Sequence, residues 1–284
     1  MTLNIGRRSA ASLLATVFLA GATLAGCASP AAPAQASAAP TFVLVHGAFE
    51  DHSIWDGVAA GLRRAGREVI VVDLPGRAGS DDTGEGGDAP TLDRYRDALE
   101  RRVAPLHAPA ILVGHSFGGI TISNLAEQHP EQVRTLVYLA AMLPQDGDSA
   151  LVLSRADKSN AIVPGSLVLS ADHRVGRMLP SDPAAQLALF CADCDAAQAG
   201  RFKESLVAEP IEPLRTPVHL SAERYGRVDK VYLATDADRV ISPQAQRTML
   251  AATPVRKVDH LQSGHSPFLR QPDAVVQALL RLDN

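Results

Sequence analysis

One serine of the chain has neighbours that suit it to act as a nucleophile. Ser116 lies in the run Gly114–Gly118, whose order Gly-His-Ser-Phe-Gly has the form G-x-S-x-G. A nucleophilic serine has to stand on a sharp turn between a strand and a helix, so the residues two positions away must be small. The context agrees, because an apolar run ends at Val113 and a helix-like segment follows the motif. The pattern predicts nucleophilic chemistry at Ser116; the alternative is a Gly-rich turn whose serine caps a helix.

A serine hydroxyl needs a general base, and the base needs an acid that orients it. After this kind of turn the chain order is Ser, then Asp or Glu, then His. Asp236 and Asp238 follow an apolar run at 231–234, and we prefer Asp238 as the acid, since either carboxylate could instead be a turn former. For the base we prefer His265 over His260, because a glycine precedes His265 and a proline follows soon after, as in a loop that presents a side chain.

The oxyanion of an acyl-transfer intermediate needs backbone N–H donors. One donor is expected from Phe117, which directly follows the serine, and the second from Ala48, in the loop His46–Phe49 after the first apolar run. His46 is expected to be a packed, hydrogen-bonded turn residue, and His115 is expected to support the turn rather than take part in chemistry. This chemistry requires neither a metal ion nor an organic cofactor.

The composition indicates a folded enzyme-sized domain rather than a nucleic-acid-binding protein. The chain has 284 residues, of which 46% are hydrophobic and 20% charged, with a formal net charge of −4. It can therefore bury a sizeable core. It has no run of like charge, and its aromatic content of 4% argues against a platform for stacked bases, so no nucleic-acid partner is expected.

The elements that must position these residues alternate between strand and helix. Continuous apolar runs fit strands that are covered on both faces, as in a parallel sheet flanked by helices, so the pattern predicts an α/β fold. Strands are predicted at 42–45, 69–72, 110–113, 136–139, 231–234 and, weakly, 256–258, and helices at 58–65, 92–103, 118–128, 243–251 and 273–282.

Between about 145 and 225 the alternation stops. This segment contains helical pieces and several prolines, and no strand is predicted in it. An interrupted α/β pattern favours an inserted helical cap over the carboxyl edge of the sheet, where open α/β sheets place their sites. The predicted domain is 41–284, with the cap at about 145–225.

The N-terminal 40 residues resemble an export signal and a tether. Arg7 and Arg8 precede an apolar stretch, and the run Leu24–Cys27 resembles a bacterial lipobox, in which the chain is cut before the cysteine and the cysteine is lipidated. We therefore expect a signal peptide at 1–26 and lipidated Cys27 at the start of an Ala/Pro-rich tether, 27–40. An ordinary secretory signal cut further on and an uncleaved anchor are the alternatives. The expected location is outside the cytoplasm, on a membrane, at its periplasmic or extracellular side.

Two further cysteines, Cys191 and Cys194, form a C-x-x-C sequence inside the predicted cap. In an oxidising compartment such a pair can close a small disulfide; otherwise the two are partly buried thiols. No strand leads into the pair as a thioredoxin-like site requires, and we assign it no catalytic role.

Together these residues resemble the α/β-hydrolase superfamily, and more narrowly the branch that holds plant methylesterases, hydroxynitrile lyases and their bacterial esterase relatives. The segments that resemble this branch are Phe42–Ala48, Ile111–Gly119, Lys230–Asp238 and Gly264–Phe268. In that branch the second aspartate of the acid loop belongs to the triad, which supports Asp238.

The resemblance implies an α/β-hydrolase fold and a serine esterase acting on a small to medium hydrophobic ester, with Ser116, Asp238 and His265 as its triad. The lyases of the branch have a lysine after the catalytic histidine and a threonine in the first loop, where this chain has Ser266 and Gly47. These departures favour ester hydrolysis over cyanohydrin cleavage. A lyase, a perhydrolase or haloperoxidase, and a non-enzymatic small-molecule binder are the alternatives.

Overall fold

The computed structural model describes residues 39–80, 90–162, 166–178 and 183–283. The predicted signal peptide 1–26, Cys27 and nearly all of the tether lie outside the described residues. Among the described residues, no helix is both long and apolar enough to cross a membrane.

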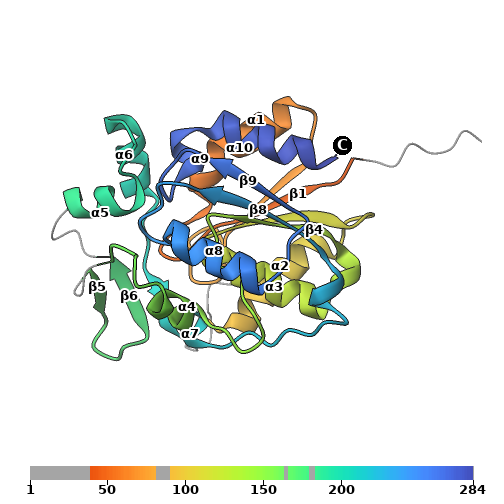
Figure 1. Cartoon of the computed structure of the whole chain (residues 1–284), viewed down its shortest axis with the longest axis horizontal. Helices are drawn as coiled ribbons and strands as arrows, with labels where there is room; N and C mark the ends of the chain where they lie inside the picture. The colour runs from red at the N-terminus through yellow and green to blue at the C-terminus, as the bar shows by residue number, and fades with distance from the viewer. Residues whose placement is uncertain (1–38, 81–89, 163–165, 179–182, 284) are drawn as a thin grey trace, which may run out of the picture. The chain divides into compact units, whose positions relative to one another are not determined.

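A parallel sheet of six strands, counted over the described residues, forms the centre of the fold (Figure 1). Its order is β2-β1-β3-β4-β8-β9, and every neighbouring pair is parallel. The strands are β1 (Phe42–Val45), β2 (Val69–Val72), β3 (Ala110–His115), β4 (Val133–Leu139), β8 (Asp229–Thr235) and β9 (Lys257–Leu261). All six predicted strands are confirmed. β9 runs three residues beyond its predicted end, so His260 lies in the strand itself.

Helices cover both faces of the sheet, which explains why the strands are apolar without alternation. Along β1, Val43 and Val45 join one buried cluster with the helices α2, α3 and α8, and Phe42 and Leu44 join the other with α1 and α10. Figure 1 shows these two layers on opposite sides of the sheet. Their bounds are α1 (Asp56–Arg64), α2 (Leu92–Val103), α3 (Gly118–Gln128), α8 (Pro243–Ala252) and α10 (Pro272–Leu280).

The segment inserted after β4 contains both helices and strands, whereas the sequence predicted helical pieces alone. Its helices are α4 (Ala150–Ala156), α5 (Pro183–Phe190), α6 (Ala196–Glu204) and α7 (Ile211–Arg215). Its strands β5 (Leu167–Leu169), β6 (Val175–Met178) and β7 (Glu209–Pro210) form a separate antiparallel sheet in the order β5-β6-β7.

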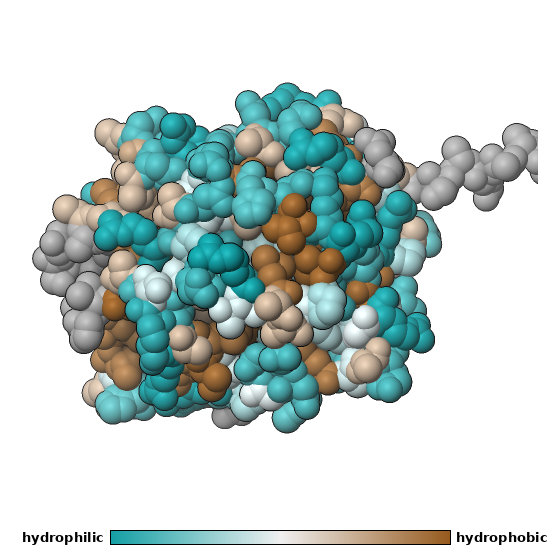
Figure 2. Space-filling model, in the orientation of Figure 1, coloured by the Kyte–Doolittle hydropathy of each residue, from teal (hydrophilic) through white to brown (hydrophobic). Residues whose placement is uncertain are grey.

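The outer surface of this segment carries apolar side chains. Val152 on α4, Ile162, and Leu167 and Val168 on β5 are between 38% and 52% exposed. In Figure 2, brown hydrophobic residues reach the surface at the lower left, over the elements that Figure 1 labels β5, β6 and α4. The segment therefore presents an apolar surface as well as an apolar interior.

Candidate active site

Ser116 lies on a strained turn between β3 and α3. Its backbone has φ of +51°, in the left-handed region that non-glycine residues rarely occupy. A Cβ at Gly114 would lie 2.7 Å from the backbone of Gly118, and one at Gly118 would lie 2.8 Å from the carbonyl oxygen of His46. Both glycines are therefore required by close backbone approach, and the turn has the strand-to-helix geometry predicted for a nucleophile.

Backbone hydrogen bonds of Ser116 also hold the turn in place. The Ser116 carbonyl oxygen accepts hydrogen bonds from the backbone N–H of Gly119, at 3.1 Å, and of Met142, at 3.0 Å. The Ser116 N–H donates to the Leu139 carbonyl oxygen across β4 at 3.4 Å. The bonds with Leu139 and Met142 attach the turn to the end of β4, so the strain in φ is held by the sheet.

Asp238 and His265 form a buried pair at the ends of β8 and β9. Asp238 Oδ2 lies 2.8 Å from His265 Nδ1, and the two residues are 3% and 1% exposed. Asp238 Oδ1 accepts from the N–H groups of Val240 and Ile241, and Oδ2 also accepts from the hydroxyl of Thr235. A carboxylate held by so many donors is an acceptor, so Nδ1 of His265 carries the proton.

The second nitrogen of His265 is therefore the one that can act as a base. Nε2 is buried and has no hydrogen-bond partner among the residues that the structure describes. With Nδ1 protonated, Nε2 presents a lone pair. An unpartnered buried acceptor is unfavourable in a purely structural role, and it is what a general base needs before substrate arrives.

Asp236 and His260, the alternative candidates for acid and base, form a second pair at the surface. Asp236 Oδ1 lies 2.7 Å from His260 Nδ1, and the His260 side chain is 61% exposed. Gln262 also donates to Asp236. The two aspartates and two histidines thus sort into one buried pair and one exposed pair. The sequence-based preference selected both members of the buried pair.

His115, next to Ser116, links the serine turn to the histidine loop. Its Nε2 lies 3.0 Å from the carbonyl oxygen of His265, and the two imidazole rings lie 4.6 Å apart. Its Nδ1 lies 2.9 Å from Oε2 of Glu50, a carboxylate that is only 2% exposed. His115 therefore supports the turn, as predicted, and it does so together with an acid that the sequence did not indicate.

The loop after β1 packs directly against the serine. A Cβ at Gly47 would lie 2.9 Å from the Ser116 Cβ and 2.8 Å from Glu50 Oε2, so only glycine fits there. The Gly47 N–H donates to Glu50 Oε2 at 3.1 Å. Phe49 has φ of +64° and donates its N–H to Glu209 Oε2 at 2.7 Å. Ala48 lies between these two anchored residues.

His46 is a buried, neutral turn residue in this loop. Its Nδ1 donates to the Gly47 carbonyl oxygen at 2.8 Å, and its Nε2 accepts from the Leu74 N–H at 3.1 Å. Burial and the nearby Arg77 charge hold the pKa of His46 well below its ordinary value of 6.5. The prediction of a packed, hydrogen-bonded role for His46 is confirmed.

Beneath the same loop lies a buried ionic cluster that the sequence did not reveal. Arg77 pairs with Glu209, and both side chains have no exposed surface. The Tyr95 hydroxyl donates to Glu209 Oε1 at 2.9 Å. Burial and the Glu209 charge raise the pKa of Tyr95 well above its ordinary value. Because Glu209 belongs to β7, this cluster attaches the inserted segment to the sheet domain.

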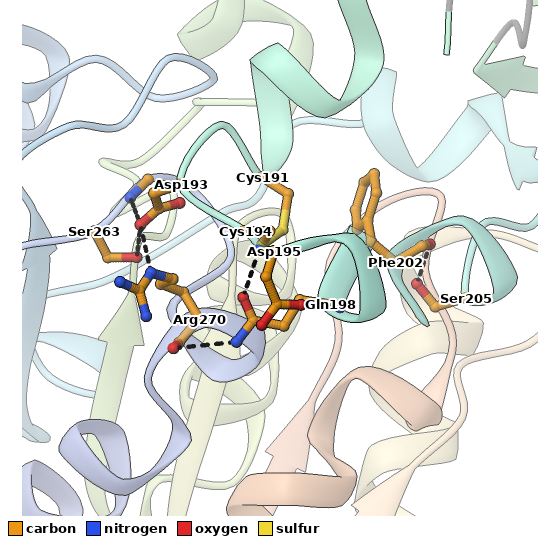
Figure 3. Close-up of a disulfide and its surroundings, with 10 residues drawn as sticks. Cys191, Asp193, Cys194, Asp195, Gln198, Phe202, Ser205, Ser263 and Arg270 are labelled. Carbon is orange, nitrogen blue, oxygen red and sulfur yellow. Dashed lines mark hydrogen bonds and ion pairs between the residues drawn. A yellow bond between two sulfur atoms is a disulfide. The ribbon is translucent and has the colours of Figure 1, made fainter. Parts of the chain in front are cut away.

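The Cys191–Cys194 pair forms a disulfide between α5 and α6, in the inserted segment (Figure 3). The sequence left this open. Among the described residues there is no group of three or more His, Cys, Asp or Glu side chains that could hold a metal ion.

An apolar cavity of about 290 Å³ lies beside the acid loop, between α4 and α8. Leu153, Val240 and Met249 are among its lining residues, and Ser116, Asp238 and His265 are not. It is therefore a neighbour of the site rather than the place where Ser116 would meet a substrate.

Comparison with known proteins identifies a family and several relatives. The family model described as "Alpha/beta hydrolase family" matches residues 42–278. Methylesterase 1 of Arabidopsis thaliana is 28% identical over 258 residues, which cover 85% of this chain and 95% of that protein. The pyrethroid hydrolase of Sphingobium wenxiniae is 28% identical over 243 residues, covering 84% of this chain and 85% of the other.

Solved structures show the same fold. The crystal structure of a pyrethroid hydrolase from Sphingobium faniae JZ-2 superposes with a TM-score of 0.71 at 23% identity, covering 86% of this chain and 97% of that one.

Proposed function

The chain belongs to the alpha/beta hydrolase family, and on this basis we propose that it is a carboxylic ester hydrolase that works through an acyl-enzyme on Ser116. The observation that carries the proposal is the buried Asp238–His265 pair, whose Nε2 has no partner among the described residues. It lies at the same sheet edge as the strained turn that presents Ser116, because parallel strands end on one side.

In the proposed mechanism each residue has one task. His265 Nε2 takes the proton from the Ser116 hydroxyl as the oxygen attacks the ester carbonyl carbon. Asp238 keeps the Nδ1 proton in place and stabilises the imidazolium that forms. His265 then gives its proton to the leaving alcohol, and a water molecule activated by the same imidazole releases the acid from Ser116.

The oxyanion of the tetrahedral intermediate would be held by the N–H groups of Ala48 and Phe117. Phe117 precedes the first turn of α3, where backbone N–H groups lack partners within the helix and the helix dipole favours negative charge. Ala48 is supported by the anchoring of Gly47 and Phe49 on either side of it.

The proposed substrate is a small to medium hydrophobic ester. The names methylesterase and methyl jasmonate esterase of two relatives describe ester cleavage, and another relative is named a pyrethroid hydrolase. The inserted segment, which contains strands as well as helices within the predicted cap of about 145–225, would cover such a substrate, and it has exposed apolar side chains.

We also propose that the enzyme is exported and tethered to a membrane through lipidated Cys27. Arg7, Arg8 and the apolar stretch before Cys27 support this, as does the disulfide, since disulfides persist in oxidising compartments. Growth of the natural host with a radiolabelled fatty acid should label the wild-type protein. Loss of the label in Cys27→Ser is expected, and an equally labelled variant would contradict the proposal.

The function is tested with a panel of acyl and alkyl esters of graded length, run on wild type and on Ser116→Ala. We expect kcat to fall by at least about 10⁴-fold in the variant, because removal of a triad nucleophile leaves only binding and oxyanion stabilisation. Rapid quenching and mass spectrometry should find the acyl group on the peptide that contains Ser116.

Absence of hydrolysis across the panel, or equal rates in the variant, would exclude the esterase. Turnover without an acyl-enzyme would favour a lyase.

A further inference from the structure

The residues next to the disulfide contact the loop that carries the proposed base. Phe190, the residue before Cys191, packs its ring 5.8 Å from the His265 ring. Cys191 is 3% exposed and Cys194 is partly exposed. The bond closes a tight turn, in which the Cys194 N–H donates to the Cys191 carbonyl oxygen at 3.0 Å.

Asp193, inside this turn, binds the two residues that immediately precede His265. Its Oδ2 accepts from the Ser263 hydroxyl and from the Gly264 N–H, each at 3.2 Å. The carboxylate also lies 4.0 Å from the Arg270 guanidinium, on the far side of His265 in the chain. Figure 3 shows Asp193 directed toward Ser263 and Arg270 from the disulfide turn.

The residues after the disulfide reinforce the contact. Asp195 begins α6 with a capping box, in which its side chain accepts from the Gln198 N–H and the Gln198 side chain accepts from the Asp195 N–H. The Gln198 amide also donates to the Arg270 carbonyl oxygen at 3.5 Å. The turn and the start of α6 therefore contact the histidine loop both before and after His265.

We propose that Asp193 is a positioning residue for His265 and that the Cys191–Cys194 disulfide holds Asp193 in place. This inference rests on the proposed role of His265 as the base. Asp238 fixes the ring of His265 through Nδ1. Asp193 holds the backbone that leads to this ring through Gly264, together with the Ala237 N–H, which donates to the Ser263 carbonyl oxygen, and with the His115 contact to the His265 carbonyl oxygen. A displacement of about 1 Å in a catalytic group can cost about 10²-fold in rate, so a loosened loop is expected to lower kcat.

The bond is open to a dithiol reductant because Cys194 is partly exposed. A thiolate of the reductant attacks one sulfur and forms a mixed disulfide. The second thiol of the reductant then closes its own disulfide, which leaves two cysteine thiols; two electrons and two protons pass from the reductant to the protein. The turn is then free to relax, and the Asp193 contacts weaken.

The first test compares Asp193→Ala with Asp193→Asn. The alanine variant removes both acceptor bonds, so we expect kcat to fall about 10- to 100-fold with little change in KM. The asparagine variant keeps an acceptor oxygen and should recover a large part of the rate. The matched control is Asp172→Asn in the β5–β6 hairpin, an exposed carboxylate that likewise accepts from a serine hydroxyl and a backbone N–H, and it should leave kcat unchanged.

The second test uses the disulfide itself. Dithiothreitol should lower kcat of the wild-type protein toward that of Cys191→Ser/Cys194→Ser, and it should not affect the double variant further. The reduced protein and Asp193→Ala should also show a shifted acid limb in the pH profile of kcat/KM, because that limb reports the environment of the base. A merely structural turn would change thermal unfolding without moving this limb.

The outcomes are distinguishable from failure of the proposed function. If Ser116→Ala is inactive while Asp193→Ala and the reduced protein keep wild-type kcat, the positioning role is wrong and the esterase stands. If Ser116→Ala keeps its activity, the proposed function itself fails. Should Asp193→Ala not fold, dithiothreitol treatment of the wild type and the double variant decide the question by the same criteria.

Discussion

The imidazole of His115 is hydrogen-bonded on both sides. Its Nε2 faces a carbonyl oxygen, which only accepts, so Nε2 carries a hydrogen. Its Nδ1 faces the Glu50 carboxylate at 2.9 Å, and two lone pairs at that distance would repel. The contact between His115 and Glu50 is therefore a hydrogen bond. This buried hydrogen bond lies next to Ser116 and between the two loops of the proposed site.

Glu50→Ala should destabilise the protein and slow the reaction. It leaves the Gly47 N–H and His115 Nδ1 without partners in a buried site, which costs about 1–3 kcal/mol for each unsatisfied group. We expect a loss of about 2–4 kcal/mol in the free energy of unfolding, measured with urea, and a lower kcat. Glu50→Gln keeps an acceptor and should lose less. If the alanine variant unfolds at the same urea concentration as the wild type, the two hydrogen bonds of Glu50 do not stabilise the fold.

The two histidines that compete for the role of base should separate clearly on mutation. His265→Ala removes the proposed base and should lower kcat by about 10²–10⁴-fold. His260→Ala removes only an exposed hydrogen bond to Asp236 and should change kcat less than about 2-fold. The esterase rates of the two purified variants are the measurement. Comparable losses would mean that His265 is not the sole candidate for the base.

At the residue scale, sequence reasoning found residues that belong to motifs and missed those that do not. The G-x-S-x-G turn and the loop flanks of His265 are local signals. Glu50 and Glu209 are single acids in ordinary surroundings, and only their burial, 2% and 0% exposed, distinguishes them. Burial of one charged residue depends on partners far away in the chain, such as Arg77 for Glu209, and a single sequence does not show them.

At the scale of elements, β7 attaches the inserted segment to the sheet domain through Glu209. This carboxylate accepts from Arg77, from Tyr95 and from the Phe49 N–H. Phe49 in turn accepts from the Val207 N–H at 2.9 Å. The strand thus reaches the same loop that presents Ala48, and the inserted segment and the proposed oxyanion hole share one anchor.

Glu209→Ala should therefore be strongly destabilising. It leaves the buried Arg77 cation unpaired, and loss of one partner of a buried ion pair typically costs about 3–5 kcal/mol. Urea unfolding should show this loss. Glu212→Ala is the control, since that exposed acid lies three residues later in α7 and should cost less than about 1 kcal/mol. If the two substitutions destabilise the protein equally, Glu209 does not hold the inserted segment to the sheet domain.

Apart from β9, which is only weakly predicted, the strands of the sheet domain are continuous apolar runs bounded by turn residues, and its helices have a helical spacing of apolar residues. The strands of the inserted segment have two to four residues, too few to show a period. Their hairpin depends instead on local bonds. Ser170 and Asp172 bond to one another and to the following backbone, and His173 adopts a positive φ. Such bonds do not follow from hydrophobic patterning.

For the whole molecule, buried His46 predicts how stability depends on pH. Its pKa in the folded protein is lowered below 6.5 by burial and by the facing charges of Arg77, His115 and His52. The unfolded chain therefore binds a proton first as the pH falls below 6.5, and this contribution to stability is lost on acidification. The slope approaches at most about 1.4 kcal/mol per pH unit for one proton.

This pH dependence can be measured by urea unfolding at pH 7, 6 and 5. Wild type should lose stability over this range, and His46→Asn, although less stable overall, should show a shallower slope because it cannot take up that proton. Parallel slopes would mean that His46 is not the group responsible. The carboxylates titrate mainly below this range and affect both proteins alike.

The three residues of the proposed triad also bear on how the chain folds. Ser116, Asp238 and His265 follow β3, β8 and β9, and β9 is an edge strand that pairs only with β8 within the described sheet. Contacts between segments so distant in sequence form slowly, since chain closure is entropically costly. A partly folded molecule can hold the serine turn before the base is in place. A fluorophosphonate should then label Ser116 only after β9 has joined the sheet. The time course of this labelling during refolding would therefore measure how fast the last strand is added.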